Sequence, residues 1–119
     1  MGGTEMRFSA SIILPIIVLG LTSCTGAMSG VDPDLDCAAN ISASTYLHVG
    51  GQIDLGDDTY RKSLFSLGVY TAKYAIPNGL SEADTAAEIK ALREQLLAAE
   101  KPEKVKIRAV SCIRKTPNA

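Results

Sequence analysis

The 119-residue sequence has little of the chemistry on which most metal sites and nucleic-acid interfaces depend. It contains no tryptophan and one histidine, His48, and aromatic residues make up 5% of the chain. One histidine excludes sites built on a histidine pair, and three cysteines leave few thiols for a Cys/His zinc site. The formal net charge is −1 with both signs spread along the chain, so there is no basic stripe for phosphate binding. We therefore expect no metal, no cofactor and no nucleic-acid partner.

Reaction motifs are missing as well. No serine lies in a Gly-x-Ser-x-Gly turn, and the chain has neither a phosphate-binding loop nor a Cys-x-x-Cys-His haem attachment sequence. The acidic group Asp54, Asp57 and Asp58 lacks the alternating spacing and closing glutamate of an EF-hand, and helix capping explains it more simply. We expect no catalytic residue and a protein that is not an enzyme. A hydrolase with a dispersed site is the less favoured alternative.

The N-terminus lacks an apolar run long enough for a permanent membrane span. The uninterrupted part, Ile12 to Leu21, has about ten residues, against roughly twenty for a transmembrane helix. It follows the short positive start Met6-Arg7-Phe8, so residues 1–23 have the n-region and h-region of a secretory signal peptide. The acidic Glu5 favours a start at Met6 over Met1. We expect an exported protein.

The signal ends in Leu21-Thr22-Ser23-Cys24. This tetrapeptide resembles the lipobox of bacterial lipoproteins, in which a peptidase cuts before a diacylated cysteine. The resemblance implies that Cys24 is lipidated and that the protein belongs to the cell envelope, anchored to a membrane and facing the periplasm. Cleavage near residue 27, after the small residues Thr25-Gly26-Ala27, is the alternative and would release a soluble periplasmic or secreted protein.

Either cleavage removes Cys24 from the free thiols, by acylation or with the signal. Cys37 and Cys112 then remain, and oxidising compartments pair thiols. Their disulfide would close a loop of about 75 residues, for which chain entropy gives a stabilisation of about 4 kcal/mol. Two buried, reduced cysteines acting as small hydrophobic residues are the alternative.

After the signal, composition predicts a tether and one small domain. Residues 24–36 are small and polar and include Gly26, Gly30 and Pro33, which is typical of a flexible segment. Residues 37–119 suffice for one domain and are too few for two. Hydrophobic periodicity and breaker residues predict four helices joined by short loops, so the fold class is an all-α, four-helix arrangement. The first helix is expected to begin at Asp34 or Asp36 and to end at residue 49. The other three are expected over residues 59–76, 81–99 and 103–115.

Boundary signals support these ranges. Gly50-Gly51 ends the first helix, and Asp57 or Asp58 caps the second. Pro77-Asn78-Gly79 stops the second, because proline disfavours a helical residue before it. Ser81 and Asp84 form a Ser-x-x-acid pattern close to a capping box. Pro102 suits the first turn of the last helix.

The second helix carries two neighbouring apolar stripes. One stripe comprises Tyr60, Leu64, Leu67, Thr71 and Tyr74, and the other comprises Phe65, Val69, Ala72 and Ile76. Two adjacent stripes make a wide apolar face. We therefore expect this helix to be the central one.

The last segment has a rival interpretation. Residues 104–111 alternate between apolar and charged positions, a period of two that is also typical of a short strand. We favour helix, because the other elements are helical and a single strand would have no partner.

Tyrosines supply the candidate binding surface. Tyrosine offers a large contact face with a polar tip, which suits both interfaces and partly buried core sites. The candidate residues are Tyr46, His48, Tyr60, Tyr70 and Tyr74. Core packing is the favoured role of the tyrosines, and capping or a surface position is the favoured role of His48.

We expect an envelope protein without enzymatic activity, which binds a protein partner or contributes to surface organisation. In size, helicity and its single disulfide the chain is similar to bacterial acid-stress chaperones. This similarity implies a small periplasmic stress chaperone as the alternative function.

Overall fold

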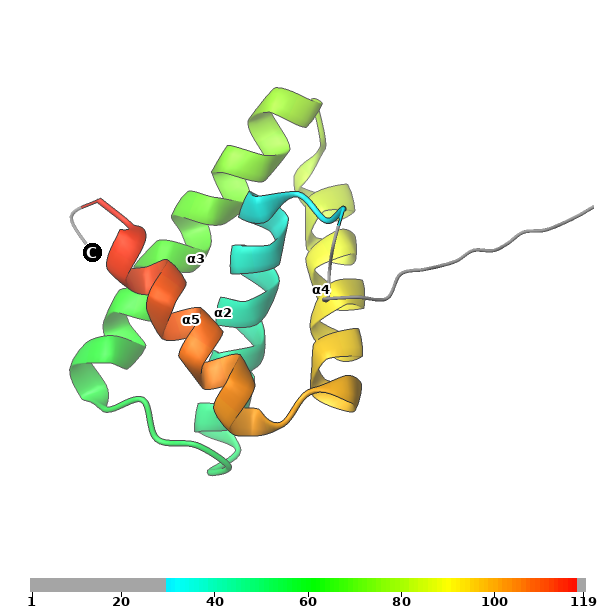
Figure 1. Cartoon of the computed structure of the whole chain (residues 1–119). Helices are drawn as coiled ribbons and strands as arrows, with labels where there is room; N and C mark the ends of the chain where they lie inside the picture. Colours follow the sequence, from blue (N-terminus) through cyan, green and yellow to red (C-terminus); the bar gives the residue numbers. More distant parts are fainter. Residues whose placement is uncertain (1–29, 118–119) are drawn as a thin grey trace, which may run out of the picture. The chain divides into compact units, whose positions relative to one another are not determined.

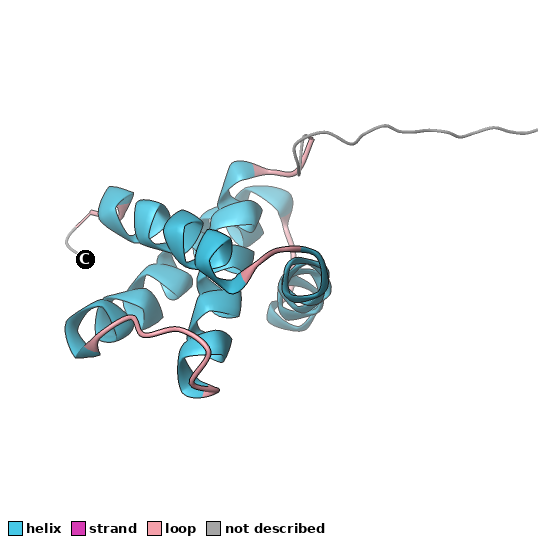
Figure 2. Cartoon of the chain, turned by 60° about the horizontal axis from the view of Figure 1, so that its bottom comes forward, coloured by secondary structure: helices cyan, strands magenta, loops and turns pink. Residues whose placement is uncertain are grey.

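The computed structural model describes residues 30–117, and from Asp32 onward the chain forms one unit. The predicted signal peptide, Cys24 and residues 25–29 of the predicted tether lie outside the described residues. The described part contains four helices and no strand (Figures 1 and 2). They are α2 (Pro33–Val49), α3 (Asp57–Asn78), α4 (Glu82–Ala99) and α5 (Pro102–Lys115). The predicted all-α fold is confirmed, and residues 104–111 are helix and not strand.

Helix α2 begins earlier than predicted. The side chain of Asp32 accepts hydrogen bonds from the backbone N–H of Asp34, at 2.8 Å, and of Leu35, while Pro33 occupies the first helical position. Proline suits that position because its missing N–H would have no partner there. Asp34 and Asp36 therefore lie in the first turn instead of capping it. Residues 33–36, predicted to end the tether, are helical.

Helix α3 extends beyond both predicted ends. It begins at Asp57 after Gly56, and neither Asp57 nor Asp58 caps it through a side-chain hydrogen bond. At the other end the helix continues through Pro77 to Asn78 and closes on Gly79, whose φ of 63° is left-handed. Pro77 is tolerated because it falls in the final turn, where it removes a single backbone donor. Of the predicted stop signal Pro77-Asn78-Gly79, the glycine ends the helix.

The signals for α4 and α5 are confirmed. The Ser81 hydroxyl accepts the backbone N–H of Asp84 at 3.0 Å, which caps the start of α4. Pro102 is the first residue of α5.

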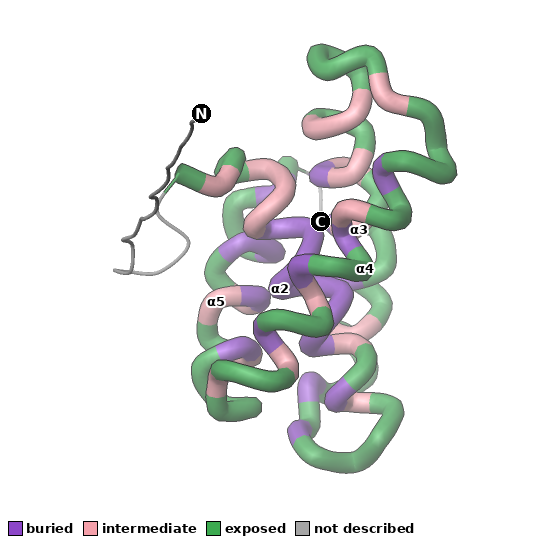
Figure 3. The backbone as a smooth tube through the Cα atoms, turned by 90° about the vertical axis from the view of Figure 1, so that its right-hand side faces the viewer, coloured by how far each residue is buried: buried purple, intermediate pink, exposed green. Residues whose placement is uncertain are grey.

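The central helix is α2, which contacts each of the other three (Figure 1). It lies between α3 and α4, and α5 crosses its remaining side. Figure 3 shows buried residues concentrated along it. Most of them are small, and the fully buried ones are Ala38, Ala39, Asn40, Ile41, Ala43 and Ser44. Small side chains let three neighbouring helices approach one helix closely.

Helix α3 is peripheral, so the prediction that it is central was wrong. Its buried residues are Ser63, Ser66 and Tyr70, whereas Leu64, Phe65 and Ile76 from the two predicted stripes are exposed. The reason is that α3 has only one helix, α2, packed extensively along it. A single neighbour covers one narrow face of a helix and leaves the adjacent stripe in water.

Two apolar clusters form the core. The first surrounds the disulfide that joins Cys37 of α2 to Cys112 of α5, as predicted. It also contains Ile41, Tyr70 and Ile89. The second lies toward the C-terminal end of α2, and its buried members are Ala43, Leu47, Ile53, Leu55 and Val105. The disulfide thus connects the first helix of the domain to the last.

Candidate functional site

Two of the five predicted surface residues come together beside the end of α2. His48 lies in the last turn of α2, and Tyr60 lies in the first turn of α3. Their rings stack with centroids 4.7 Å apart. The contact forms because loop 50–56 folds back and places the start of α3 against the end of α2. His48 is therefore the centre of a small polar and aromatic site.

His48 also holds the loop in place. Its Nδ1 atom accepts a hydrogen bond from the backbone N–H of Leu55 at 3.1 Å. A ring nitrogen that accepts a hydrogen bond carries no proton, so this contact requires the neutral tautomer with hydrogen on Nε2. A carboxylate oxygen of Asp54 lies 4.0 Å from the same Nδ1. Protonation of Nδ1 would end the bond to Leu55 and leave the imidazolium facing Asp54.

The loop that His48 holds contributes to the core. Ile53 and Leu55 are both 7% exposed and belong to the second apolar cluster. The same Asp54 oxygen accepts the backbone N–H of Gly56 at 2.8 Å, which closes a tight turn before α3. Release of this loop would expose two large apolar side chains. His48 is thus placed where a change in its charge acts on buried surface.

A cavity of about 320 Å³ opens near this site, between α2, α4 and α5. Its polar side chains are few, and Glu100 is engaged with Arg108 at 3.5 Å. The residues that line it are Tyr46, Leu47, Gly50, Gln52, Leu97, Glu100, Pro102 and Val105. His48 is not among the lining residues.

Tyr46 lies apart from the His48 pair and contacts a residue that the sequence analysis did not single out. Its side chain is 63% exposed, and the Arg93 guanidinium of α4 lies over its ring, 5.4 Å from the centroid. Arg93 also donates from Nη1 to the Ser42 hydroxyl at 3.2 Å. The sequence signal that could have identified Arg93 is its spacing. Arg93 follows Ile89 by four residues and so borders the buried stripe of α4.

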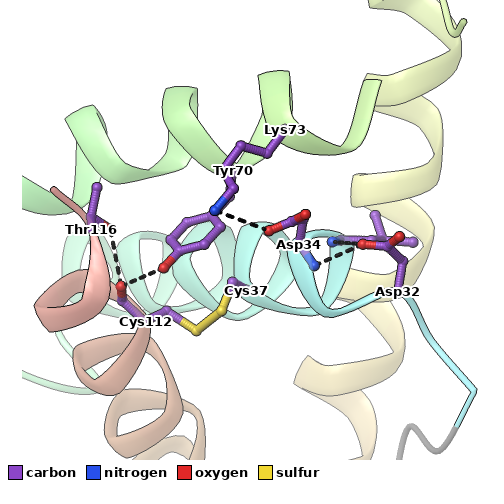
Figure 4. A network of polar contacts seen from close by, with 8 residues as sticks. Asp32, Asp34, Cys37, Tyr70, Lys73, Cys112 and Thr116 are labelled. Carbon is purple, nitrogen blue, oxygen red and sulfur yellow. Dashed lines mark hydrogen bonds and ion pairs between the residues drawn. A yellow bond between two sulfur atoms is a disulfide. The ribbon is translucent and has the colours of Figure 1, made fainter. Parts of the chain in front are cut away.

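Tyr70 has a structural role. Its hydroxyl donates to the backbone carbonyl of Cys112 at 2.8 Å, and the Thr116 hydroxyl donates to the same carbonyl at 3.0 Å (Figure 4). Lys73 lies over the Tyr70 ring and pairs with Asp34 at 3.7 Å. The contacts tie α3 to α5 and α2 beside the disulfide, which agrees with the packing role favoured for the tyrosines.

Tyr74 lies further along α3 and faces α4. Its hydroxyl donates to the Glu88 carboxylate. This hydrogen bond, and to a smaller extent burial and the charge of Glu88, raise the pKa of Tyr74. The structure therefore divides the predicted surface into three separate places: His48 with Tyr60, Tyr46 with Arg93, and the Tyr70 and Tyr74 contacts of α3.

The described residues contain neither a metal-binding cluster nor a helix suited to span a membrane. Within residues 30–117, no group of three or more histidine, cysteine or acidic side chains is arranged to hold a metal ion. None of the four helices is both long and apolar enough to cross a membrane. Neither finding assigns a function.

Comparison of the chain with protein-family models, with curated proteins and with solved structures found no match.

Proposed function

We propose that this chain is an exported protein of the bacterial cell envelope, without enzymatic activity, which serves as a binding or structural module and is anchored through a lipid on Cys24. The observation that carries the proposal is the disulfide between Cys37 and Cys112. Disulfides persist in oxidising compartments and are rare in the cytosol. The pairing also leaves Cys24 as the odd cysteine, at the position where the lipobox resemblance requires a modified one.

The structure described above is consistent with such a module. A disulfide cross-links the helical body from its first helix to its last, and the body presents exposed apolar residues on α2 and α3. Tyr46, Val49 and Ile76 are more than half exposed. Tyr46 and Val49 lie three residues apart near the C-terminal end of α2, and an exposed apolar patch of this kind is typical of interaction surfaces.

An intact mass of the mature protein from its native host tests the anchor. We expect an N-terminus at Cys24 that carries a diacylglyceryl group, and a gain of two hydrogens on reduction. The Cys24→Ser variant should lose the lipid mass and leave the membrane fraction, while it keeps the disulfide. An unlipidated N-terminus downstream of Cys24 would overturn the anchor and favour the soluble periplasmic alternative.

Crosslinking in intact envelopes tests the binding role. We expect the same envelope partner to be recovered in repeated experiments with the native chain. A Tyr46→Ala variant removes the exposed tyrosine of α2 and is expected to reduce that recovery. Recovery of no partner above the background of an untagged strain would count against a binding module.

A second candidate function is a small stress chaperone of the periplasm, and the His48 contact favours it. Acid would protonate Nδ1, end the hydrogen bond from Leu55, and loosen the loop that buries Ile53 and Leu55. Exposed apolar surface is what a chaperone needs to bind unfolded clients. The Asp54 carboxylate opposes this change to some degree, since it would attract the imidazolium.

The chaperone candidate is tested by fluorescence of a hydrophobic dye at neutral and at acidic pH. The native chain should gain dye binding and suppress client aggregation at the acidic end. His48→Gln, which keeps an acceptor but does not titrate, should show a much smaller gain. An equal gain in both proteins, or unchanged client aggregation, would exclude this function.

A further inference from the structure

A groove runs between α3 and α4 on the side where Arg93 lies. Its cavity has a volume of about 360 Å³. Four of the six lining residues are apolar or present a methyl group, and the full set is Leu67, Thr71, Glu82, Ala86, Ile89 and Arg93. A second cavity of about 450 Å³ shares Thr71 and Glu82 with the first and adds apolar surface from the end of α3. The two cavities adjoin at Thr71 and Glu82, and we call the mostly apolar surface that lines them the α3–α4 groove.

Among the described residues that line the α3–α4 groove, Arg93 is the only one of basic charge. None of the ion pairs formed within residues 32–117 includes it. Its Nε is buried and has no hydrogen-bond partner within residues 30–117. A guanidinium has five N–H donors, of which the Ser42 hydroxyl takes one, at 3.2 Å. A partly buried cation without a counter-ion costs free energy, and an anion in the groove would relieve that cost.

The position of Arg93 is fixed before any ligand arrives. The Ser42 hydroxyl and the Tyr46 ring hold the guanidinium from the side of α2. An arginine fixed in this way loses little side-chain entropy when it binds a planar anion through two parallel hydrogen bonds. The arrangement favours a carboxylate over a bulky or multiply charged group, because one cation neutralises one charge.

Glu82 gives the groove a direction. It lies eleven residues before Arg93 on α4, so a rise of 1.5 Å per residue places the two about 16 Å apart along the helix axis. An anionic head group is repelled at the Glu82 end and attracted at the Arg93 end. Between them lie Ala86 and Ile89 on α4 and Leu67 on α3. The apolar length between the two charges suits an alkyl chain.

We infer that the α3–α4 groove binds an anionic amphiphile, a medium-chain carboxylate, with its head group on Arg93 and its alkyl chain on Leu67, Ala86 and Ile89. The volume lies within the range of small-molecule sites, which are mostly apolar with a few placed polar groups. This inference deepens the binding-module proposal and rests on that part of it. It does not depend on whether Cys24 carries a lipid.

Titration calorimetry with decanoate and decanol tests the site, each ligand kept below the concentration at which it aggregates. The two ligands share an alkyl chain and differ in charge, so they separate the role of Arg93 from that of the apolar wall. The native chain should bind decanoate saturably and more tightly than decanol. Arg93→Gln should weaken decanoate binding by about tenfold or more, because a charged hydrogen bond is lost, and leave decanol binding unchanged.

Two more variants guard against a structural explanation. Arg61→Gln removes an exposed arginine of α3 that pairs with Asp58, and both affinities should stay at the native value. Ala86→Leu fills the groove from an exposed position of α4 and should abolish binding of both ligands. Circular dichroism would confirm that each variant remains helical. A third variant, Arg93→Lys, keeps the positive charge and should retain part of the preference for decanoate over decanol.

Three results would overturn the inference. They are no saturable binding of decanoate to the native chain, equal losses of decanoate and decanol binding in Arg93→Gln, and native affinity in Ala86→Leu. The mass of the mature N-terminus is unaffected by these outcomes, so failure of the groove and failure of the lipid anchor are told apart.

Discussion

The hydroxyl of Tyr70 connects α3 to α5 through one atom. It donates to the Cys112 carbonyl, which also accepts from Thr116. We expect Tyr70→Phe to lower the free energy of unfolding by about 1 kcal/mol, the usual net value of one hydrogen bond. Urea denaturation measures the change. Tyr74→Phe is the matched control, because its partner Glu88 is not part of the core, and a loss as large as that of Tyr70→Phe would contradict the assignment.

Asp36 makes stability depend on pH. Burial raises its pKa above the ordinary value of 3.8, and the charge of Arg108 and a hydrogen bond from Asn40 offset part of this. When the folded pKa is the higher one, the unfolded chain releases its proton first, so stability is lost as pH rises through the interval between the two values. Asp36→Asn removes that loss.

The Asp36→Asn variant is compared with the native chain by urea denaturation at about pH 3 and about pH 7. We expect its stability relative to the native chain to be more favourable at the higher pH. A constant difference would mean that folding does not shift the pKa of Asp36, and a difference that favours the variant at the lower pH would mean that Asp36 is stabilised as a carboxylate; either result would contradict the dominance of burial.

Among the helices, α2 has the least room for larger side chains. Ala43 is fully buried in the second apolar cluster. We expect Ala43→Leu to destabilise the domain by about 1–3 kcal/mol, since added methylene groups force neighbouring side chains and backbone to shift. Ala98→Leu on the exposed side of α4 is the control and should stay within about 0.5 kcal/mol. Thermal denaturation by circular dichroism would compare them, and equal effects would contradict a tightly surrounded α2.

The existence of the four helices could be predicted from the sequence. Which helix is central and which is peripheral could not. Glycine, proline and the Ser81 cap are local signals, so they marked the ends of α4 and the start of α5 within a residue or two. The centrality of α2 is a tertiary property. Hydrophobic periodicity predicted α3 as the central helix instead. A wide apolar face gives the same sequence pattern whether one helix or three pack against it.

The buried hydroxyl groups of α2 also explain why the sequence did not identify it as the central helix. Ser44 donates to the Ile41 carbonyl at 2.8 Å, and Thr45 donates to the Ser42 carbonyl at 2.8 Å. A serine or threonine that satisfies its own hydroxyl within the helix can be buried at small cost. Ser44 is fully buried. The serine and threonine residues of α2 therefore made its sequence look less apolar than that of a buried helix, although α2 is the most buried of the four.

At the scale of the molecule, the disulfide has the largest single effect. It joins residues 75 positions apart, for which chain entropy gives about 4 kcal/mol. We expect the Cys37→Ser/Cys112→Ser double variant to lose about that much, so that it is largely unfolded near 37 °C if the native margin is small. Urea denaturation of oxidised protein is the measurement. Cys24→Ser is the matched control and should leave the domain's stability unchanged.

The candidate sites show the same division between local and long-range information. His48 was identified as the one histidine and Tyr60 as one of the tyrosines that offer a large contact face with a polar tip, although their contact depends on the fold of loop 50–56. Arg93 was overlooked because charge on an amphipathic helix ordinarily faces water. Its role depends on Ser42 and Tyr46, and Ser42 lies 51 positions away in the sequence. No spacing rule connects residues across that separation.

The surrounded position of α2 also bears on the dynamics of its backbone. Amide hydrogens exchange with solvent when they are transiently opened, and those with three helices packed around them open only when the whole fold does. The amides of α2 should therefore be the slowest to exchange, and their rates should report the stability of the whole domain. The C-terminal turns of α3, with one packed side, should exchange through smaller local openings, so a ligand that bridges α3 and α4 would slow α3 first.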